Sequence, residues 1–152
     1  MSIDWQVKTF DELSLSQLYA ILKLRNEVFI LEQKCYFPDI DNNDQHALHL
    51  FAINAQSTVA AYCRLLPPSL SHEQVSIGRV VTNPEMRKLG LGKELVKRGI
   101  VESHRLFPGQ TIVIGAQVYL LSFYESFGFI QLGESHLEDR IAHIKMILKS
   151  GL

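Results

Sequence analysis

The segment from Arg87 to Gly92 has the composition of a turn that binds a diphosphate. It follows the apolar run VSIGRVVT and precedes an amphipathic stretch, so we expect a strand, a tight turn and the start of a helix. Gly90 and Gly92 let the backbone turn sharply and come close to a ligand. The first N–H groups of a helix lack intrahelical partners and attract anions, and Arg87 and Lys88 add positive charge. The segment therefore predicts an anion site, with an ordinary glycine-rich turn as the alternative.

Two familiar nucleotide-binding motifs are excluded by the residues around these glycines. A Walker A loop needs serine or threonine after its lysine, but Glu94 follows Lys93, and Arg87 stands where the first glycine belongs. A Rossmann motif needs a third glycine three positions after Gly92, where the sequence has Leu95. What remains is the pattern R-x-x-G-x-G after a strand. We expect the diphosphate contacts to come from Arg87, Lys88, Leu89, Gly90, Leu91, Gly92 and Lys93.

The bulk composition is that of one ordinary globular domain. The chain has 152 residues, of which 47% are apolar and 20% charged, and its formal net charge is −1. One domain spanning 1–152 is therefore expected, with no nucleic-acid partner. No apolar run reaches the length of a membrane span, and the N-terminus lacks the layout of a signal peptide, so we expect a cytoplasmic protein. The two cysteines, Cys35 and Cys63, form no CxxC motif.

The hydrophobic periodicity predicts the elements that must position the turn. Alternating or continuous apolar runs indicate strands at 5–10, 48–54, 58–66, 75–82, 111–116, 129–132 and 142–148. Apolar residues at helical spacing indicate helices at 15–31, 90–107 and 120–127. Residues 32–47 are rich in aspartate and asparagine and predict a polar loop. The order β-α-β-β-β-α-β-α-β-β implies a mixed α/β domain that combines hairpins with βα units.

Two further segments join the turn in a resemblance to a known family. Arg87 to Gly92 resembles the coenzyme A loop of the GCN5-related N-acetyltransferases, the GNAT superfamily. The run VVTNP before it resembles the family's central strand, and QVYLLSFYESFGF, which begins at Gln117, resembles the family's last-helix segment. Within the superfamily the chain is most similar to the ElaA-type branch. The segments that carry this likeness are 24–35, 39–44, 49–50, 64–67, 77–81 and 138–144.

The resemblance implies a fold and a donor site. The expected fold is a single GNAT-like domain with a central, mostly antiparallel sheet, in which one pair of parallel strands splays apart, and with flanking helices. The expected co-substrate is acetyl-CoA, bound by Val80 and Val81 of the splayed strand as well as by the turn. Tyr124 is then the expected acid for the leaving thiolate, with a core or rim tyrosine as the alternative. Gln117 stands where the family usually has asparagine, and a contact with pantetheine is expected from it.

The resemblance also implies direct transfer of the acetyl group to an amine in one ternary complex. The N–H of Val81 is expected to stabilise the oxyanion. Each histidine among the candidate bases has a hydrogen-bonded structural role as its alternative. The general base is left open among Glu32, His49, Glu138 and His143. Arg25 and Arg79 are expected to pair with Glu32 or with a carboxylate of the substrate, and a buried ion pair that braces the helix on the sheet is the alternative. Those expected contacts are Arg25, Glu32, Asp41, Arg79 and Glu138.

The aspartate-rich segment and the histidines do not indicate a metal. Asp39 to Asp44 begins like a calcium loop, but Asp44 and Leu50 stand where an EF-hand has glycine and glutamate. A solvated loop or a site for the acceptor's ammonium group is expected instead. The sequence has no HExxH motif and no cysteine pair, so no metal is expected.

Three functions are compatible with these features. The first is an acetyltransferase that acts on a primary amine of a small molecule or a protein. The second is a non-catalytic acetyl-CoA-binding or sensing domain of the same fold, and the third is a nucleotide-binding protein. Tyr124 and the cluster of acidic and histidine residues favour the enzyme. The oligomeric state, monomer or homodimer, is left open.

Overall fold

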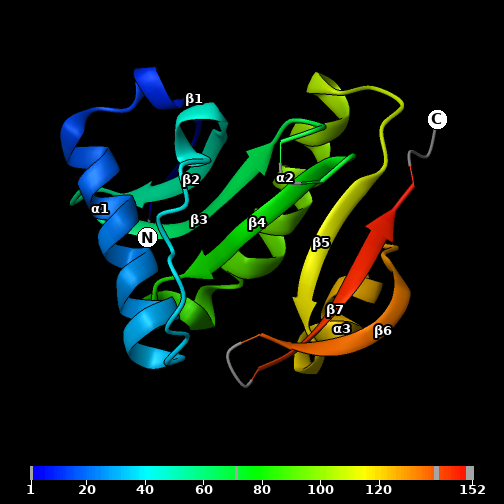
Figure 1. Cartoon of the computed structure of the whole chain (residues 1–152). Helices are drawn as coiled ribbons and strands as arrows, with labels where there is room; N and C mark the ends of the chain where they lie inside the picture. The colour runs from blue at the N-terminus through cyan, green and yellow to red at the C-terminus, as the bar shows by residue number, and fades with distance from the viewer. Residues whose placement is uncertain (1, 71, 139–140, 150–152) are drawn as a thin grey trace.

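One sheet runs through the protein. The computed structural model describes residues 2–70, 72–138 and 141–149, and within them seven strands pair in the order β1-β2-β3-β4-β5-β7-β6 (Figure 1). The strands are β1 (Ile3–Thr9), β2 (Leu48–Asn54), β3 (Val59–Leu66), β4 (Val75–Thr82), β5 (Ile112–Gln117), β6 (Ile130–Glu138) and β7 (Ile141–Leu148). The expected order of strands and helices, and with it the mixed α/β fold, is confirmed.

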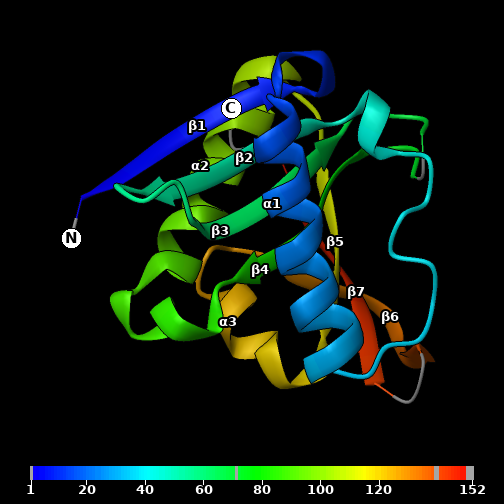
Figure 2. The ribbon, with the colours of Figure 1, turned by 90° about the vertical axis from the view of Figure 1, so that its left-hand side faces the viewer.

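Helices cover both faces of the sheet. They are α1 (Leu15–Arg25), the π-helix η2 (Asn26–Glu32), α2 (Leu91–Leu106) and α3 (Leu121–Glu125). Short 3₁₀ turns are η1 (Phe10–Glu12), η3 (Asp44–His46), η4 (Pro84–Leu89) and η5 (Val118–Leu120). The first helix, α1, lies on one face, and α2 lies on the other (Figures 1 and 2). None of the helices in the described ranges is long and apolar enough to cross a membrane.

The central strand β3 shows how the sheet is enclosed. Successive side chains of a strand point to opposite faces. Tyr62 therefore packs with Ile21 of α1, whereas Cys63 packs with Leu95 of α2. All eight residues of β3 are buried. The two apolar layers fix α1 and α2 against the strands from which the site is built.

The parallel pair splays apart, as expected. β4 and β5 are the one parallel pair among the described strands, and only Val75 with Ile112 and Ser76 with Val113 are paired. Beyond those two positions the strands diverge, and the gap between them widens toward their C-terminal ends (Figure 1). The central sheet is thus mostly antiparallel with a V-shaped opening.

A bulge in β4 lies beside this opening. Gly78 pairs with Arg64 and Val81 pairs with Tyr62, so β4 places two residues opposite one residue of β3. Arg79, one of these two, has a φ of +52°. A bulge bends its strand and changes the direction of side chains. The bulge thus lies in the part of β4 that no longer pairs with β5, and it includes residue 79.

Two elements differ from the sequence expectations. The helix expected at 15–31 continues to Glu32, but its last seven residues are π-helical, and the N–H of Gln33 donates to the carbonyl of Val28 at 2.8 Å. The strand expected at 129–132 extends to Glu138 with a register shift after Leu132. This strand is at the edge of the sheet and exposed, so it needs no apolar alternation that the sequence would reveal.

Candidate active site

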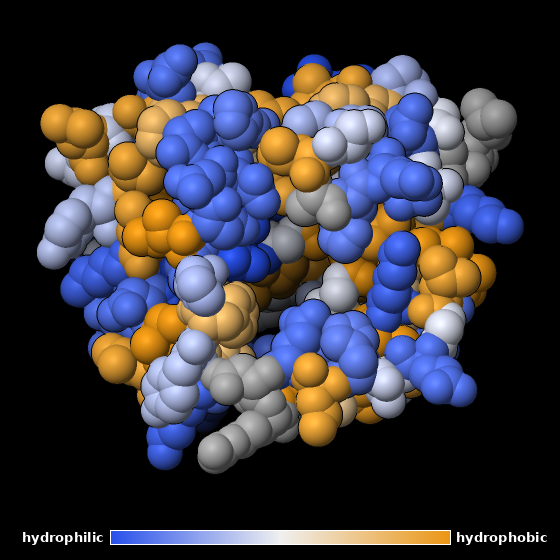
Figure 3. Space-filling view, viewed as in Figure 1, coloured by the Kyte–Doolittle hydropathy of each residue, from blue (hydrophilic) through white to orange (hydrophobic). Residues whose placement is uncertain are grey.

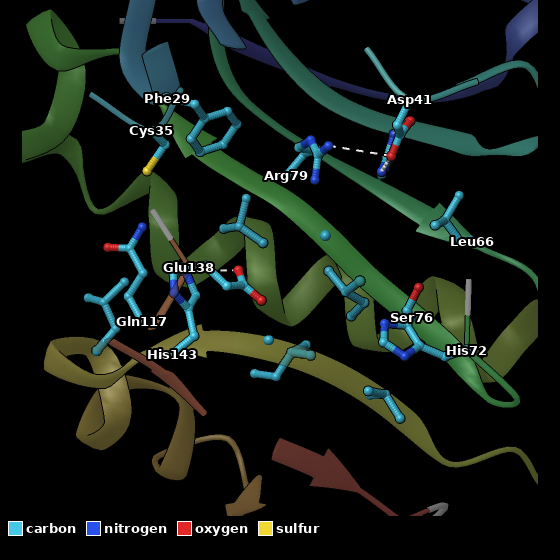
Figure 4. A pocket seen from close by; sticks show the side chains of 18 of the residues that line it. Phe29, Cys35, Asp41, Leu66, His72, Ser76, Arg79, Gln117, Glu138 and His143 are labelled. Carbon is cyan, nitrogen blue, oxygen red and sulfur yellow. Dashed lines mark hydrogen bonds and ion pairs between the residues drawn. The ribbon is translucent and has the colours of Figure 1, made fainter. Parts of the chain in front are cut away.

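A cavity of about 360 Å³ opens where β4 and β5 part, and we call it the splay cavity (Figures 3 and 4). Its walls come from η2 with the loop that follows it, from β3 and β4, from β5 with η5 and α3, and from β6 and β7. It extends from Phe29 and Gln117 at one end to His72 and Ser76 at the other (Figure 4). Four separate parts of the chain thus meet around one hollow.

The glycine turn lies at the C-terminal end of β4. Pro84–Leu89 forms one 3₁₀ segment, Gly90 adopts a φ of +72°, and α2 starts at Leu91. A positive φ at Gly90 avoids the steric cost that a Cβ would bring. The free N–H groups of the first turn of α2 therefore face outward at the helix's positive end. None of the expected contacts 87–93 lines the splay cavity. Arg87 to Gly90 and Lys93 are exposed, whereas Leu91 is buried and Gly92 is half-buried.

Arg87 is bound to an acidic side chain. Its Nη2 donates to Oε1 of Glu32 at 2.6 Å and its Nη1 donates to Oε2 at 3.2 Å, with both side chains 42% exposed. Glu32 does not line the splay cavity. The structure thus separates Glu32 from the other base candidates and places it beside the turn.

Tyr124 lies at the splay cavity with a hydroxyl that is free to donate. The residue is 6% exposed, and its ring packs edge-on against Phe123 and Phe129. Among the residues that the structure describes, none forms a hydrogen bond with the Tyr124 hydroxyl. Burial raises the pKa of this phenol, so it stays protonated at neutral pH. Tyr124 is therefore a residue of the cavity wall that can donate a proton.

Two other expected donor-site residues flank the opening. Val80 lines the splay cavity, whereas the side chain of Val81 is buried and packs with α1. Gln117 lies at the end of β5, where its Nε2 donates to Oε1 of Gln33 at 3.0 Å. The side chains of Val80 and Gln117 thus approach the opening from its two strands, with Gln33 bridging to the end of η2.

His143 and Glu138 form a polar pair on the β7 side of the cavity (Figure 4). Nδ1 of His143 is 2.8 Å from the carbonyl oxygen of Ile141, which can only accept, so Nδ1 carries the proton. Nε2 then has a lone pair in the neutral ring, and it lies 3.6 Å from Oε2 of Glu138. The other carboxylate oxygen of Glu138 is 2.9 Å from Nε2 of His136. This pair presents two proton acceptors to the cavity.

An ion-pair network of three arginines and three aspartates forms the opposite wall. Arg25 bonds to Asp39 and Asp44, Arg64 to Asp41 and Asp44, and Arg79 to Asp39 and Asp41. Burial would raise the pKa of Asp41, but the hydrogen bonds and charge of Arg64 outweigh burial and lower it. Arg25 is 0% exposed and does not reach the cavity, whereas Asp41, Arg64 and Arg79 line it. The network holds the loop 35–44 against the sheet.

His49 is a structural residue rather than a cavity residue. It is 0% exposed, with Nδ1 2.7 Å from the Tyr62 hydroxyl and Nε2 2.9 Å from the carbonyl oxygen of Asp44. Burial lowers the pKa of the ring, so it stays neutral. Both nitrogens are occupied, and the ring does not line the splay cavity. We therefore do not retain His49 as a candidate base.

The structure divides the expected site residues into two groups. Those that line the splay cavity are Asp41, Arg79, Val80, Gln117, Tyr124, Glu138 and His143. Those that lie elsewhere are Arg25, Glu32, His49, Val81 and the turn residues 87–93. No group of three or more side chains suited to a metal ion is found in the described ranges.

Several residues of the splay cavity were not expected to take part in the site. Arg64 donates to Asp41 and Asp44, and it is the one charged residue within the run VAAYCRLL of β3. A cation inside an apolar strand requires a buried anion, so its type and position were an available signal. For Phe29 and Phe37, which also line the cavity, the sequence offers no comparable signal.

The comparisons with known proteins agree with this architecture. The family model described as "Acetyltransferase (GNAT) domain" matches residues 21–150. Protein ElaA of Escherichia coli is 38% identical over 145 residues, which are 95% of this chain and 95% of ElaA. Its crystal structure superposes with a TM-score of 0.90 over 96% of this chain and 99% of that one, at 37% identity. The chain therefore belongs to the ElaA-type branch of the GNAT acetyltransferase family.

Two further solved structures extend the comparison. An acyl-CoA N-acyltransferase from Pseudomonas aeruginosa is 40% identical, with a TM-score of 0.91 over 96% of this chain and 99% of that one. A spermidine N-acetyltransferase from Vibrio cholerae, crystallised with CoA and spermine, is 16% identical, with a TM-score of 0.71 over 96% and 95% of the two chains. The second likeness concerns the fold alone.

Proposed function

We propose that this protein transfers the acetyl group of acetyl-CoA to a primary amine by direct attack in a ternary complex. One observation carries the proposal: the splay cavity is lined by Tyr124, whose protonated hydroxyl has no hydrogen-bond partner among the described residues, and by the paired acceptors of His143 and Glu138. A group-transfer reaction needs a proton donor and a proton acceptor within one pocket. Membership of the GNAT family supports the same chemistry.

In the proposed complex, the turn 87–93 binds the diphosphate and the pantetheine arm enters between β4 and β5. The bound thioester lies next to Val80, where the diverging strand leaves backbone N–H groups without sheet partners. The N–H of Val81 is our candidate donor for the carbonyl oxygen as it becomes negative. Holding both reactants in one cavity removes much of the entropic cost of the encounter.

The proton transfers follow from the two polar walls. An acceptor ammonium placed between Nε2 of His143 and Oε2 of Glu138 would donate hydrogen bonds to both atoms and pass one proton to Nε2. The amine nitrogen then attacks the carbonyl carbon, a C–N bond forms, and the C–S bond breaks. The thiolate takes the proton of the Tyr124 hydroxyl, and the second proton that the nitrogen loses on becoming an amide returns to the Tyr124 oxygen through water. The second candidate function, a CoA-binding domain without turnover, shares the donor half of this scheme and lacks these steps.

The experiment that tests the proposal measures release of free CoA thiol from acetyl-CoA in the presence of amines. Polyamines, amino acids, arylalkylamines and short peptides form the panel. We expect thiol release and a matching acetylated product with at least one class. Tight binding of acetyl-CoA with no thiol released by any amine would leave the binding-domain function as the better account.

The assignment of the turn has its own prediction, with a matched control in the chain. Gly90→Asp places a carboxylate where the diphosphate is expected, and we predict that CoA binding is lost. Gly109→Asp is the control, because Gly109 has a φ of +79°, close to the +72° of Gly90, and a Cβ at either position meets nothing within 4 Å. Isothermal calorimetry with CoA measures both variants. Equal affinity in the two variants would remove the turn from the site.

A further inference from the structure

Arg79 has an unusual backbone conformation. Its φ of +52° lies in the left-handed region, which is sterically unfavourable for a residue with a Cβ. Such strain persists where the surrounding structure requires it, and it concentrates at functional sites. Here it accompanies the bulge of β4. Arg79 lines the splay cavity at this bulge, next to Gly78 and Val80, which line it as well.

The guanidinium of Arg79 is only partly used by the protein. Its Nε donates to Oδ1 of Asp39 at 2.7 Å, and its Nη2 donates to the carbonyl of Asp39 at 3.0 Å and to Oδ2 of Asp41 at 3.4 Å. No acceptor for Nη1 is found among the described residues. The same side chain lies over the ring of Phe37, with 5.7 Å from Cζ to the ring centroid. Two N–H donors on a cation are thus held in position at the cavity.

The charge around Arg79 favours an additional anion. Asp39 and Asp41 are already shared with Arg25 and Arg64, so the three aspartates only balance the three arginines of the network. Burial, and after it the charge of Arg64, lowers the pKa of Arg79. An anion at Nη1 would oppose both effects, because it solvates the guanidinium and offsets its cationic neighbour. A carboxylate is the group whose shape suits a guanidinium best.

The floor of the cavity leaves space between Arg79 and the amine-binding wall. Gly78 of β4 and Gly115 of β5 both line the cavity, and a Cβ built on either one meets nothing within 4 Å. Figure 4 shows Arg79 on one side of β4, and His143 with Glu138 on the side of β5 and β7. A molecule above these glycines would face a cation at one wall and the proton acceptors at the other.

We propose that the acceptor is an amine that also carries a carboxylate, in the simplest case an amino acid, and that Nη1 of Arg79 binds this carboxylate. The inference rests on the proposed function for the placement of the amine at His143 and Glu138. To the proposed function, this inference adds the chemical class of the acceptor, an amine with a carboxylate, and the residue that selects this class, Arg79.

The test compares molecules that differ only in the carboxylate. Each common amino acid is assayed beside its carboxamide and its decarboxylated amine, by thiol release with acetyl-CoA and by calorimetric titration into the CoA complex. Since a hydrogen bond to a charged group contributes about 1.5–3 kcal/mol, the best amino acid should exceed its amide by about tenfold or more in kcat/KM and in affinity. In Arg79→Gln this preference should vanish, and in Arg79→Lys part of it should remain.

The control variant is Arg105→Gln, which removes an exposed arginine at the end of α2 that pairs with Glu102. It should keep the preference in full, and CoA binding should be unchanged in all of these variants if they are folded. An amide or decarboxylated amine that performs as well as the amino acid overturns the inference and leaves the acetyltransferase proposal intact. Preferential binding of amino acids without thiol release supports the carboxylate site and contradicts the transfer reaction. Amino acids that neither bind nor react overturn the inference as well.

Discussion

At the scale of the residue, the buried hydroxyl of Tyr124 is proposed to act in the chemical step and not in the binding of CoA. Burial raises its pKa and keeps the proton on the phenol, and none of the described residues accepts that proton. The ring packs edge-on against Phe123 and Phe129, and burial disfavours the charged phenolate. The proposed role is therefore to give a proton and to recover it, not to act as a nucleophile.

The corresponding prediction concerns Tyr124→Phe. Removing a general acid typically lowers kcat by a factor of about 10² or more. We expect a loss of that order, with the affinity for CoA changed less than about twofold, because the ring and its packing are kept. Tyr19→Phe, on the exposed side of α1, is the matched control. Steady-state kinetics with calorimetry of CoA binding decides the outcome, and an unaltered kcat would mean that water protonates the thiolate.

At the scale of the element, the end of η2 reaches both sides of the splayed strands. Glu32 binds Arg87, which follows β4, and the next residue, Gln33, binds Gln117 at the end of β5. Both partners of η2 are expected CoA contacts. Binding of CoA at these positions must therefore compete with, or rearrange, the end of the first helix.

This competition predicts that Glu32→Gln strengthens CoA binding. The variant releases Arg87 for the diphosphate and removes a negative charge beside it. Both side chains are well exposed, and an exposed ion pair contributes about 0.2–1 kcal/mol, so the gain should be about twofold to fivefold at low salt and smaller at high salt. As a control, Glu102→Gln breaks the ion pair between a half-buried Glu102 and an exposed Arg105, far along α2. If calorimetry gives the same affinity for both variants, Arg87 does not contact the phosphates.

The elements differ in how far the sequence could predict them. The strands and α1 to α3 have apolar periodicity and were expected in the right order, and the turn 87–93 was found because all of its residues are adjacent in the chain. The π-helical end of the first helix and the length of β6 were not expected, because neither changes the local pattern of apolar and polar residues. Periodicity reports burial on one face, and an exposed edge strand has none.

The acceptor half of the site depends on contacts between distant residues. Arg79 meets Asp39 across forty positions, and Arg64 meets Asp41 across twenty-three. No spacing rule connects such pairs, so the resemblance suggested Arg25, Asp41 and Arg79 without indicating which of them reaches the cavity. His49 illustrates the same limit, since residue type cannot distinguish a histidine bonded within the protein from one that faces a cavity.

At the scale of the whole molecule, the ion-pair network makes stability depend on pH. The pKa values of Asp41 and Asp44 are lowered in the folded protein, because their arginine partners outweigh the effect of burial. A depressed folded pKa gives stability that is complete above the unfolded value of about 3.9 and is lost as the pH falls through the folded value. The pKa of His49 is also lowered in the folded protein, mainly by burial. It therefore adds a loss of stability that begins as the pH falls below the unfolded pKa of about 6.5.

We therefore predict that the free energy of unfolding falls by about 2 kcal/mol or more between pH 6 and pH 3, as expected for paired carboxylates. Asp44→Asn should lower the stability at neutral pH and flatten the acid branch below pH 4, where a neutral amide no longer takes up a proton. Asp11→Asn changes an exposed carboxylate and should preserve the slope. Urea unfolding at several pH values provides the measurement. Identical acid branches in the two variants would show that the network does not set the pH dependence.

The short pairing between β4 and β5 also divides the sheet into two unequal parts. One part consists of β1, β2, β3 and β4, and the other of β5, β7 and β6. Past Ser76 and Val113, the amides on the facing edges of β4 and β5 have no partner strand across the gap. These amides should exchange with deuterium far faster than those of β3, which pairs along both edges. A ligand bound between β4 and β5 would slow hydrogen–deuterium exchange of the amides on these two facing edges. Binding at the protein surface would not protect these amides, so the exchange pattern would distinguish the two modes of binding.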